Sequence, residues 1–176
     1  MKNVIAFAGS NSKISINKQL AVYTSGLLKD VEVTILDLND FELPIYGIDH
    51  ENKVGIPEKA QDFLNLIQTS DGIVLSLAEH NGSYASVFKN IFDWMSRIDK
   101  DVWANKPMLL MSTSPGGRGG ASVLETAKNT FPHLGGNIVS SISVPSFYDN
   151  FNDGKISNKE IKANIDECVL NLKEKL

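Results

Sequence analysis

A stretch rich in hydroxyl and amide side chains stands between the first apolar segment of the chain and the first helical one. It reads Gly9-Ser10-Asn11-Ser12-Lys13-Ile14-Ser15-Ile16-Asn17. A helix that begins here presents unpaired backbone N–H groups and a partial positive charge at its first turn. The serine hydroxyls and the Asn17 amide would add donors around a phosphate. The stretch therefore predicts an anion site, although serine and asparagine also cap ordinary helices.

Two later stretches combine polar side chains with flexible backbone. One reads Glu79-His80-Asn81-Gly82-Ser83, and the other reads Ser112-Thr113-Ser114-Pro115-Gly116-Gly117-Arg118-Gly119-Gly120. His80 could act as an acid, bind a metal, support a flat ring or have no role. No second histidine or cysteine stands at ligand spacing, which argues against a metal site. Four glycines in five positions favour a planar ligand lying against backbone N–H groups, rather than a merely flexible surface loop.

Two common nucleotide-binding motifs are absent from the sequence. The first loop has only Gly9 where a dinucleotide site needs G-x-G-x-x-G, and no G-x-x-x-x-G-K-[ST] occurs anywhere. A dinucleotide pyrophosphate fingerprint and a P-loop are therefore excluded.

Short apolar segments alternate with longer helical ones along the whole chain. We expect five buried strands at residues 3–8, 31–36, 72–78, 107–113 and 137–144. Helices are expected at about residues 15–29, 57–69, 83–97, 121–134 and 157–175. Strict alternation implies right-handed crossovers, and so a single α/β domain over residues 1–176, with a five-stranded parallel sheet covered by helices on both faces. In such a sheet, ligands bind beyond the carboxyl ends of the strands where the strand order reverses, so the loops after strands one, three and four are the important ones.

Two further sequence features concern the start of the last helix and the longest connection. Ser157 followed by Glu160 resembles a capping box at the start of the last helix. Residues 39–56 form one long connection containing Leu43-Pro44-Ile45-Tyr46-Gly47, and connections of this length are often functional.

The composition narrows the class of partner. The 176 residues include 21 acidic and 17 basic side chains, a net charge of -4 without a basic run, which argues against nucleic acid and anionic membrane. The longest apolar run is far too short to span a membrane or form a signal peptide. The single cysteine, Cys168, excludes an internal disulfide, and we expect a cytoplasmic protein.

Taken together, the three loops resemble the NAD(P)H-dependent FMN reductase family of flavodoxin-like proteins. The family pattern runs roughly G-S-x-R-x-x-S-x-N, then P-E-Y-N-x-S-x-P-G-x-L-K-N-x-x-D-W-x-S-R, then S-P-G-G-x-G-G. The second motif is the most specific, and it continues here through Phe88-Lys89-Asn90, Asp93-Trp94 and Ser96-Arg97. Ser12 stands where the family often has Arg, which removes a charge-assisted phosphate contact. His80 stands for Tyr, and Ala78, Ala85 and Ser86 replace Pro, Pro and Gly.

The resemblance implies FMN, with its phosphate held by the first loop and its ring between the second and third. The residues expected to bind it are Gly9, Ser10, Ser12, Ser15, Ile16, Asn17, Glu79, His80, Asn81, Gly82, Ser83, Ser114, Gly116 and Gly117. It further implies a reductase in which hydride passes from NADPH or NADH to flavin N5 and then to a flavin, quinone, azo compound or metal oxyanion. Backbone N–H groups of Gly116 and Gly117 would stabilise the reduced ring. No catalytic acid is required, and His80 is the one candidate.

Two other classes of function compete with a reductase. An electron carrier would bind FMN without oxidising NAD(P)H, but flavodoxins are usually far more acidic than a chain of net charge -4. A phospho-acceptor receiver needs an acidic cluster after strands one and three, where Gly9-Ser10 and Ala78-Glu79 stand.

The third helix predicts self-association. Its apolar stripe, Tyr84, Phe88, Ile91, Phe92 and Met95, suffices to cover a sheet, and Val87, Trp94 and Ile98 widen it. We expect a homodimer or a dimer of dimers, and the resemblance implies that residues 43–46 reach the partner's flavin. The alternative is a helix buried under its own neighbours.

Overall fold

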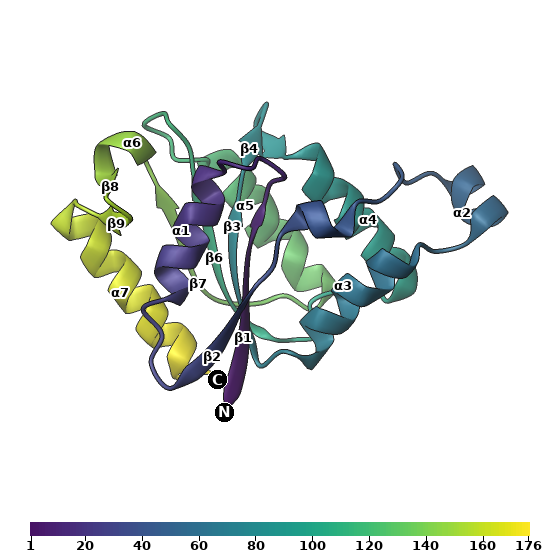
Figure 1. Ribbon diagram of the computed structural model, residues 1–176, viewed down its shortest axis with the longest axis horizontal. Coiled ribbons are helices and arrows are strands. Elements are labelled where there is room, and N and C mark those ends of the chain that lie inside the picture. The colour runs from purple at the N-terminus through teal and green to yellow at the C-terminus, as the bar shows by residue number, and fades with distance from the viewer.

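A five-stranded parallel sheet forms the centre of the molecule in the computed structural model, which describes residues 1–176 (Figure 1). Its strands are β1 (Lys2–Gly9), β2 (Val31–Ile35), β3 (Gly72–Leu77), β6 (Pro107–Thr113) and β7 (Asn137–Val144). Their spatial order is β2-β1-β3-β6-β7, so the order reverses between β1 and β3. This is the flavodoxin-like arrangement, and the predicted fold class is confirmed.

Helices cover both faces of the sheet, as the alternating apolar segments predict. One face carries α1 (Ile16–Ser25) and α7 (Lys159–Lys173), and the other carries α3 (Glu58–Thr69), α4 (Ser86–Ile98) and α5 (Ala121–Thr130). Along β1, Val4 and Ala6 pack under the first pair while Ile5 and Phe7 pack under the other three, because successive side chains of a strand point to opposite faces. None of the helices is long and apolar enough to cross a membrane. The cytoplasmic location stays a prediction.

The start of the third predicted helix is wrong. Residues 79–84 form a hairpin of β4 (Glu79–His80) and β5 (Ser83–Tyr84), and the helix begins only at Ser86. The two turn residues, Asn81 and Gly82, have φ of 52° and 79°. Asn-Gly suits this two-residue turn because both positions need the left-handed region. The hairpin therefore lifts His80 above the carboxyl end of β3.

Four further boundaries differ from the sequence prediction. The first predicted helix ends at Ser25, with Gly26 as its C-cap, rather than at about residue 29. The long connection contains the 3-10 helix η1 (Leu38–Phe41) and α2 (Ile48–Val54), and the fourth predicted helix ends at Thr130, followed by η2 (Phe131–Leu134). The expected capping box is absent: Asn158, not Ser157, caps α7, and its Oδ1 accepts from the N–H groups of Glu160 and Ile161. Before α7, the chain forms α6 (Phe147–Asn150) and the hairpin of β8 (Phe151–Asn152) and β9 (Lys155–Ile156).

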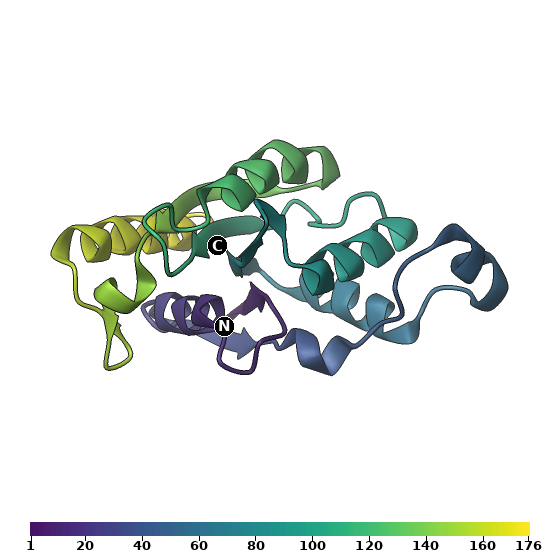
Figure 2. The ribbon, with the colours of Figure 1, turned by 90° about the horizontal axis from the view of Figure 1, so that it is seen from above.

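Residues 42–57, which we call the arm, extend from the body of the protein and carry α2 at their tip (Figures 1 and 2). The base of the arm covers Trp94, which is fully buried. The indole Nε1 donates to the Pro44 carbonyl at 2.8 Å, and the Tyr46 ring lies edge-on at 5.0 Å. The prediction that Trp94 exposes apolar area for a partner is therefore wrong, because a segment about 50 residues earlier in the chain covers it.

Candidate functional site

A hollow of about 260 Å³ lies beyond the carboxyl ends of β1, β3 and β6, at the point where the strand order reverses. The three loops singled out in the sequence meet here. The hollow is lined by Ser10, Ser12, Ile14, Ser15, Ile16, Asn17, Ala78, Glu79, His80, Thr113, Ser114, Pro115 and Tyr148. It has no lysine or arginine in its lining, so neutral donors would have to hold an anion there.

The first turn of α1 provides those donors. Ser15 caps the helix, since its Oγ accepts from the Lys18 N–H at 3.2 Å. The N–H groups of Ile16 and Asn17 come next, and a helix cannot satisfy its own first N–H groups. The hydroxyls of Ser10 and Ser12 line the same hollow. This set matches the chemistry of a phosphate monoester at a helix N-terminus.

The Asn17 side chain has a different task from the one predicted. It is 3% exposed, and its Oδ1 accepts from Ser76 Oγ at 2.8 Å and from the Thr113 N–H at 3.0 Å. Its Nδ2 donates to the Thr113 carbonyl at 3.1 Å. The side chain thus fastens α1 to β3 and β6, which leaves its backbone N–H to meet an anion.

The β4–β5 hairpin places two predicted residues in the hollow. His80 is exposed and lines it, whereas Asn81, Gly82 and Ser83 are exposed outside the lining. Glu79 also lines it, but its Oε2 accepts from the Val123 N–H at 2.9 Å. Because the N-cap of α5 is Gly120, which has no side chain, Glu79 supplies the cap from another element. The one acidic group in the lining is therefore held against a helix N-terminus, where its charge is offset.

The glycines of the site divide into two groups. Ser114 lines the hollow, and Gly116 and Gly117 are exposed beside it without lining it. Gly119, by contrast, is buried at φ 57°, and a Cβ there would lie 2.8 Å from the Val144 backbone. A Cβ on Gly9 would lie 3.0 Å from Leu77. Gly9 and Gly119 therefore serve close packing, and the open part of the glycine loop is Gly116 and Gly117.

Sequence reasoning missed five lining residues: Ile14, Ala78, Thr113, Pro115 and Tyr148. Four of them adjoin predicted site residues. Tyr148 does not, because it comes from α6, which follows the fifth strand, and that strand ends at the same edge of the sheet as the other strands. The sequence signal that could have found Tyr148 is therefore that the fifth strand ends at the same edge of the sheet as the strands before the other loops.

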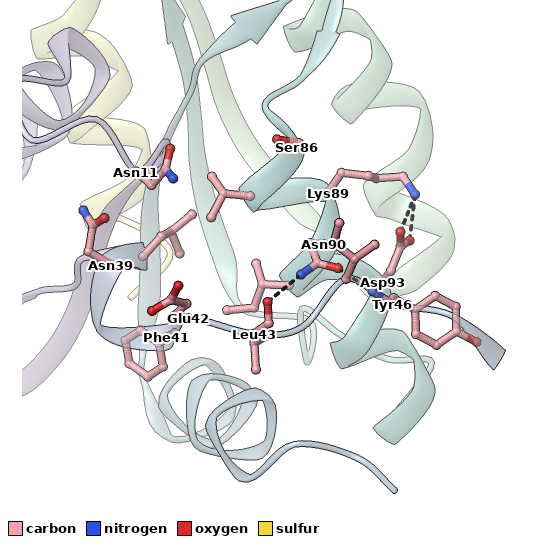
Figure 3. A pocket seen from close by; sticks show the side chains of 14 residues that line it. Asn11, Asn39, Phe41, Glu42, Leu43, Tyr46, Ser86, Lys89, Asn90 and Asp93 are labelled. Atoms are coloured by element: carbon pink, nitrogen blue, oxygen red, sulfur yellow. Dashed lines mark hydrogen bonds and ion pairs between the residues drawn. The ribbon is translucent and has the colours of Figure 1, made fainter. Parts of the chain in front are cut away.

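A larger hollow of about 530 Å³ lies between α4, η1 and the base of the arm (Figure 3). Asn90 holds its wall: its Oδ1 accepts from the Tyr46 N–H at 2.8 Å, and its Nδ2 donates to the Leu43 and Pro44 carbonyls at 3.4 and 3.0 Å. Lys89 and Asp93 pair at 2.7 Å across one helical turn. Asn90 and Trp94 of the Lys-Asn-x-x-Asp-Trp segment therefore fasten the arm to α4, and no residue of this segment lines the smaller hollow.

Further out, α2 is joined to α4 by charge. Glu51 Oε2 accepts from Arg97 Nε at 2.9 Å and from the Tyr46 hydroxyl at 3.1 Å. The bond from Arg97 lowers the pKa of the Glu51 carboxyl. This ion pair joins α2, at the tip of the arm, to α4.

The chain is similar to known proteins over most of its length. A quinone reductase of Escherichia coli K12 is 30% identical over 122 residues, covering 67% of this chain and 63% of the relative. The aligned part thus spans less than two thirds of that relative. A probable NADPH:quinone oxidoreductase 1 of Oryza sativa is 27% identical over 96% of this chain and 89% of its own.

Among solved structures, FerB, a flavoenzyme NAD(P)H:(acceptor) oxidoreductase of Paracoccus denitrificans, superposes with a TM-score of 0.77 at 26% identity, covering 99% of this chain and 96% of the other. Residues 2–149 match the profile of the NADPH-dependent FMN reductase family. The resemblance noted in the three loop motifs is confirmed, and the chain belongs to the NADPH-dependent FMN reductase family.

Proposed function

We propose that the protein binds FMN in the hollow at the β1/β3 switch point and uses it to reduce a small acceptor, such as a quinone, with NAD(P)H. The observation that carries the proposal is the convergence of three loops, with a helix N-terminus and four serine hydroxyls, on one hollow. Relatives named as quinone reductases and the FerB oxidoreductase support this class of acceptor. When bound, FMN supplies a ring that takes up hydride from a nicotinamide and passes electrons on.

The chain's own residues divide the work of holding and orienting the cofactor. Ser10, Ser12, Ser15 and the first N–H groups of α1 would hold the phosphate. The β4–β5 hairpin with His80 would flank the ring on one side, and Ser114 to Gly117 on the other. The exposed backbone of Gly116 and Gly117 leaves room for close approach, which favours N–H donors at the ring edge.

Two substitutions at Ser15 distinguish loss of the α1 N-cap from a negative charge placed beside the phosphate. Aspartate and asparagine are both good N-caps, so neither Ser15→Asp nor Ser15→Asn should unfold α1. Ser15→Asp sets a like charge beside the phosphate and should abolish FMN retention, while Ser15→Asn should retain it. Equal FMN affinity in both variants would place the phosphate elsewhere.

A steady-state assay of NAD(P)H oxidation distinguishes a reductase from an electron carrier. Purified protein loaded with FMN should oxidise NADPH or NADH in the presence of a quinone, at a rate that depends on both substrates. A carrier would hold FMN yet show no NAD(P)H oxidation above that of free FMN.

We also propose a homodimer, based on exposed apolar side chains of the arm rather than on the apolar surface of α4. Four exposed apolar side chains gather on the arm: Ile45, Ile48, Val54 and Ile56. The larger hollow, whose walls include Phe41, Leu43 and Val87, opens beside the arm's base (Figure 3). A two-fold partner would cover both at once, because an isologous contact pairs the same surfaces.

A further inference from the structure

Hydrogen bonds and aromatic packing fix the backbone of the short helix α6. Its N-cap, Ser146, lies in the left-handed region at φ 46° and ψ 57°, a conformation that costs a non-glycine residue free energy. Asn150 Nδ2 donates to the carbonyls of Pro145 and Ser146 at 2.9 and 3.3 Å. Phe147 is 2% exposed and stacks on Phe151 at 4.6 Å. The surroundings therefore fix the backbone of this turn.

The same turn is bonded to the glycine loop of the site. The Ser146 N–H donates to the Gly116 carbonyl at 3.0 Å, and the Phe147 N–H donates to the Ser114 carbonyl at 3.1 Å. Both ribbon views place α6 beside α1, whose first turn forms the anion end of the hollow (Figures 1 and 2). The turn is thus bonded to the glycine loop and lies beside α1.

What this arrangement presents to solvent is Tyr148. Its side chain lines the hollow together with Ser10, Ser12 and Ser15, and the residue is 65% exposed. Its hydroxyl forms no hydrogen bond within the chain, so the donor is free for a ligand. A large aromatic residue on a fixed backbone adds contact area at small entropic cost.

We propose that Tyr148 is a further cofactor-binding residue, whose hydroxyl donates to the phosphate of FMN and whose ring closes the hollow on the α6 side. The hollow has no lysine or arginine, so a phosphate there depends on neutral donors, and the Tyr148 hydroxyl adds one to those of Ser10, Ser12 and Ser15 in the first loop. The assignment to the phosphate, rather than to the flavin ring, follows from the position of α6 beside α1. This inference rests on the proposed binding of FMN.

The test compares two ligands that differ only in the phosphate, FMN and riboflavin, by equilibrium titration of flavin fluorescence. Tyr148→Phe removes the hydroxyl and keeps the ring. It should weaken FMN binding about tenfold, the scale of one hydrogen bond to a charged group, and change riboflavin binding less than about twofold. Tyr148→Ala removes the ring as well and should weaken both ligands. Tyr23→Phe is the matched control, because it deletes a hydroxyl on α1 outside the hollow and should change neither affinity.

Each outcome has a distinct meaning. Equal FMN affinity in wild type and Tyr148→Phe overturns the inference while leaving FMN binding intact. Equal losses for FMN and riboflavin in Tyr148→Phe also overturn it, because the hydroxyl would then not address the phosphate. A wild-type protein that binds neither flavin overturns the proposed function together with this inference. Thermal unfolding of the variants should match wild type, since the side chain is largely exposed.

Discussion

Replacing Asn17 by alanine tests how the site is held together. Three buried groups lose their partner: the Ser76 hydroxyl and both the N–H and carbonyl of Thr113. Ser76 is 0% and Thr113 1% exposed, so water cannot replace the amide without rearrangement. At about 1–3 kcal/mol for each buried polar group left unpaired, the loss is at least about 3 kcal/mol. That is a large share of the roughly 5–15 kcal/mol that stabilises a typical domain.

A loss of this size should lower Tm by about 6–12 °C, at roughly 2–4 °C per kcal/mol for a chain of this length. Thermal unfolding followed by circular dichroism measures it, with Gln19→Ala on the exposed side of α1 as the control. FMN affinity should fall as well, because α1 would no longer be fixed to β3 and β6. If Asn17→Ala lost FMN while Tm stayed within about 2 °C of wild type, the side chain would be a direct phosphate ligand and the reasoning above would be wrong.

Three other predictions concern elements around the site. Glu79→Ala should cost about 1 kcal/mol by removing the cap of α5, and Glu79→Gln, which keeps the acceptor, should restore most of it in urea unfolding; equal losses would show that the charge and not the hydrogen bond matters. The hydrogen bond from Lys18 lowers the pKa of Asp37 from its ordinary value of 3.8. The stability difference between wild type and Lys18→Met should therefore be full above that value and vanish as the pH falls through the lower pKa of the folded protein, and a difference unchanged by acid would contradict this. Ile45→Asp, at a residue 86% exposed, should give a folded monomer in sedimentation, whereas Trp94→Glu, at a buried residue, should destabilise the fold itself and lower Tm strongly; a dimer that survives Ile45→Asp would place the interface away from the arm.

The elements of the fold were predictable where one local signal dominates. Near-continuous apolar runs mark β1, β3 and β6, because strands covered on both faces need them. The edge strands β2 and β7 are marked instead by β-branched residues between polar ones. The Asn81-Gly82 turn is hard to predict from the sequence because the apolar spacing of Tyr84 and Phe88 extends the helical pattern of α4 back into the hairpin. Ser157 and Asn158 are both good caps, and only the backbone path decides which one bonds.

The site was predictable as three loops but not as a set of contacts. A sequence shows that Asn17 is polar and stands at a helix start, yet it does not show that Ser76 and Thr113, on two other strands, take its amide. In the same way, the helical spacing places Trp94 outside the apolar stripe of α4, and the sequence does not show that the arm covers it. Tyr148 joins the hollow only through the position of β7 in the sheet. Each of these contacts joins segments far apart in the sequence.

Anaerobic stopped-flow mixing of the FMN-loaded protein with NADPH, and separately with NADH, tests the central claim most directly. The flavin absorbance in the visible blue should bleach with at least one of the two reductants and return when a quinone is added. A protein that holds FMN but stays oxidised for minutes with both reductants would contradict the reductase and establish the electron carrier in its place.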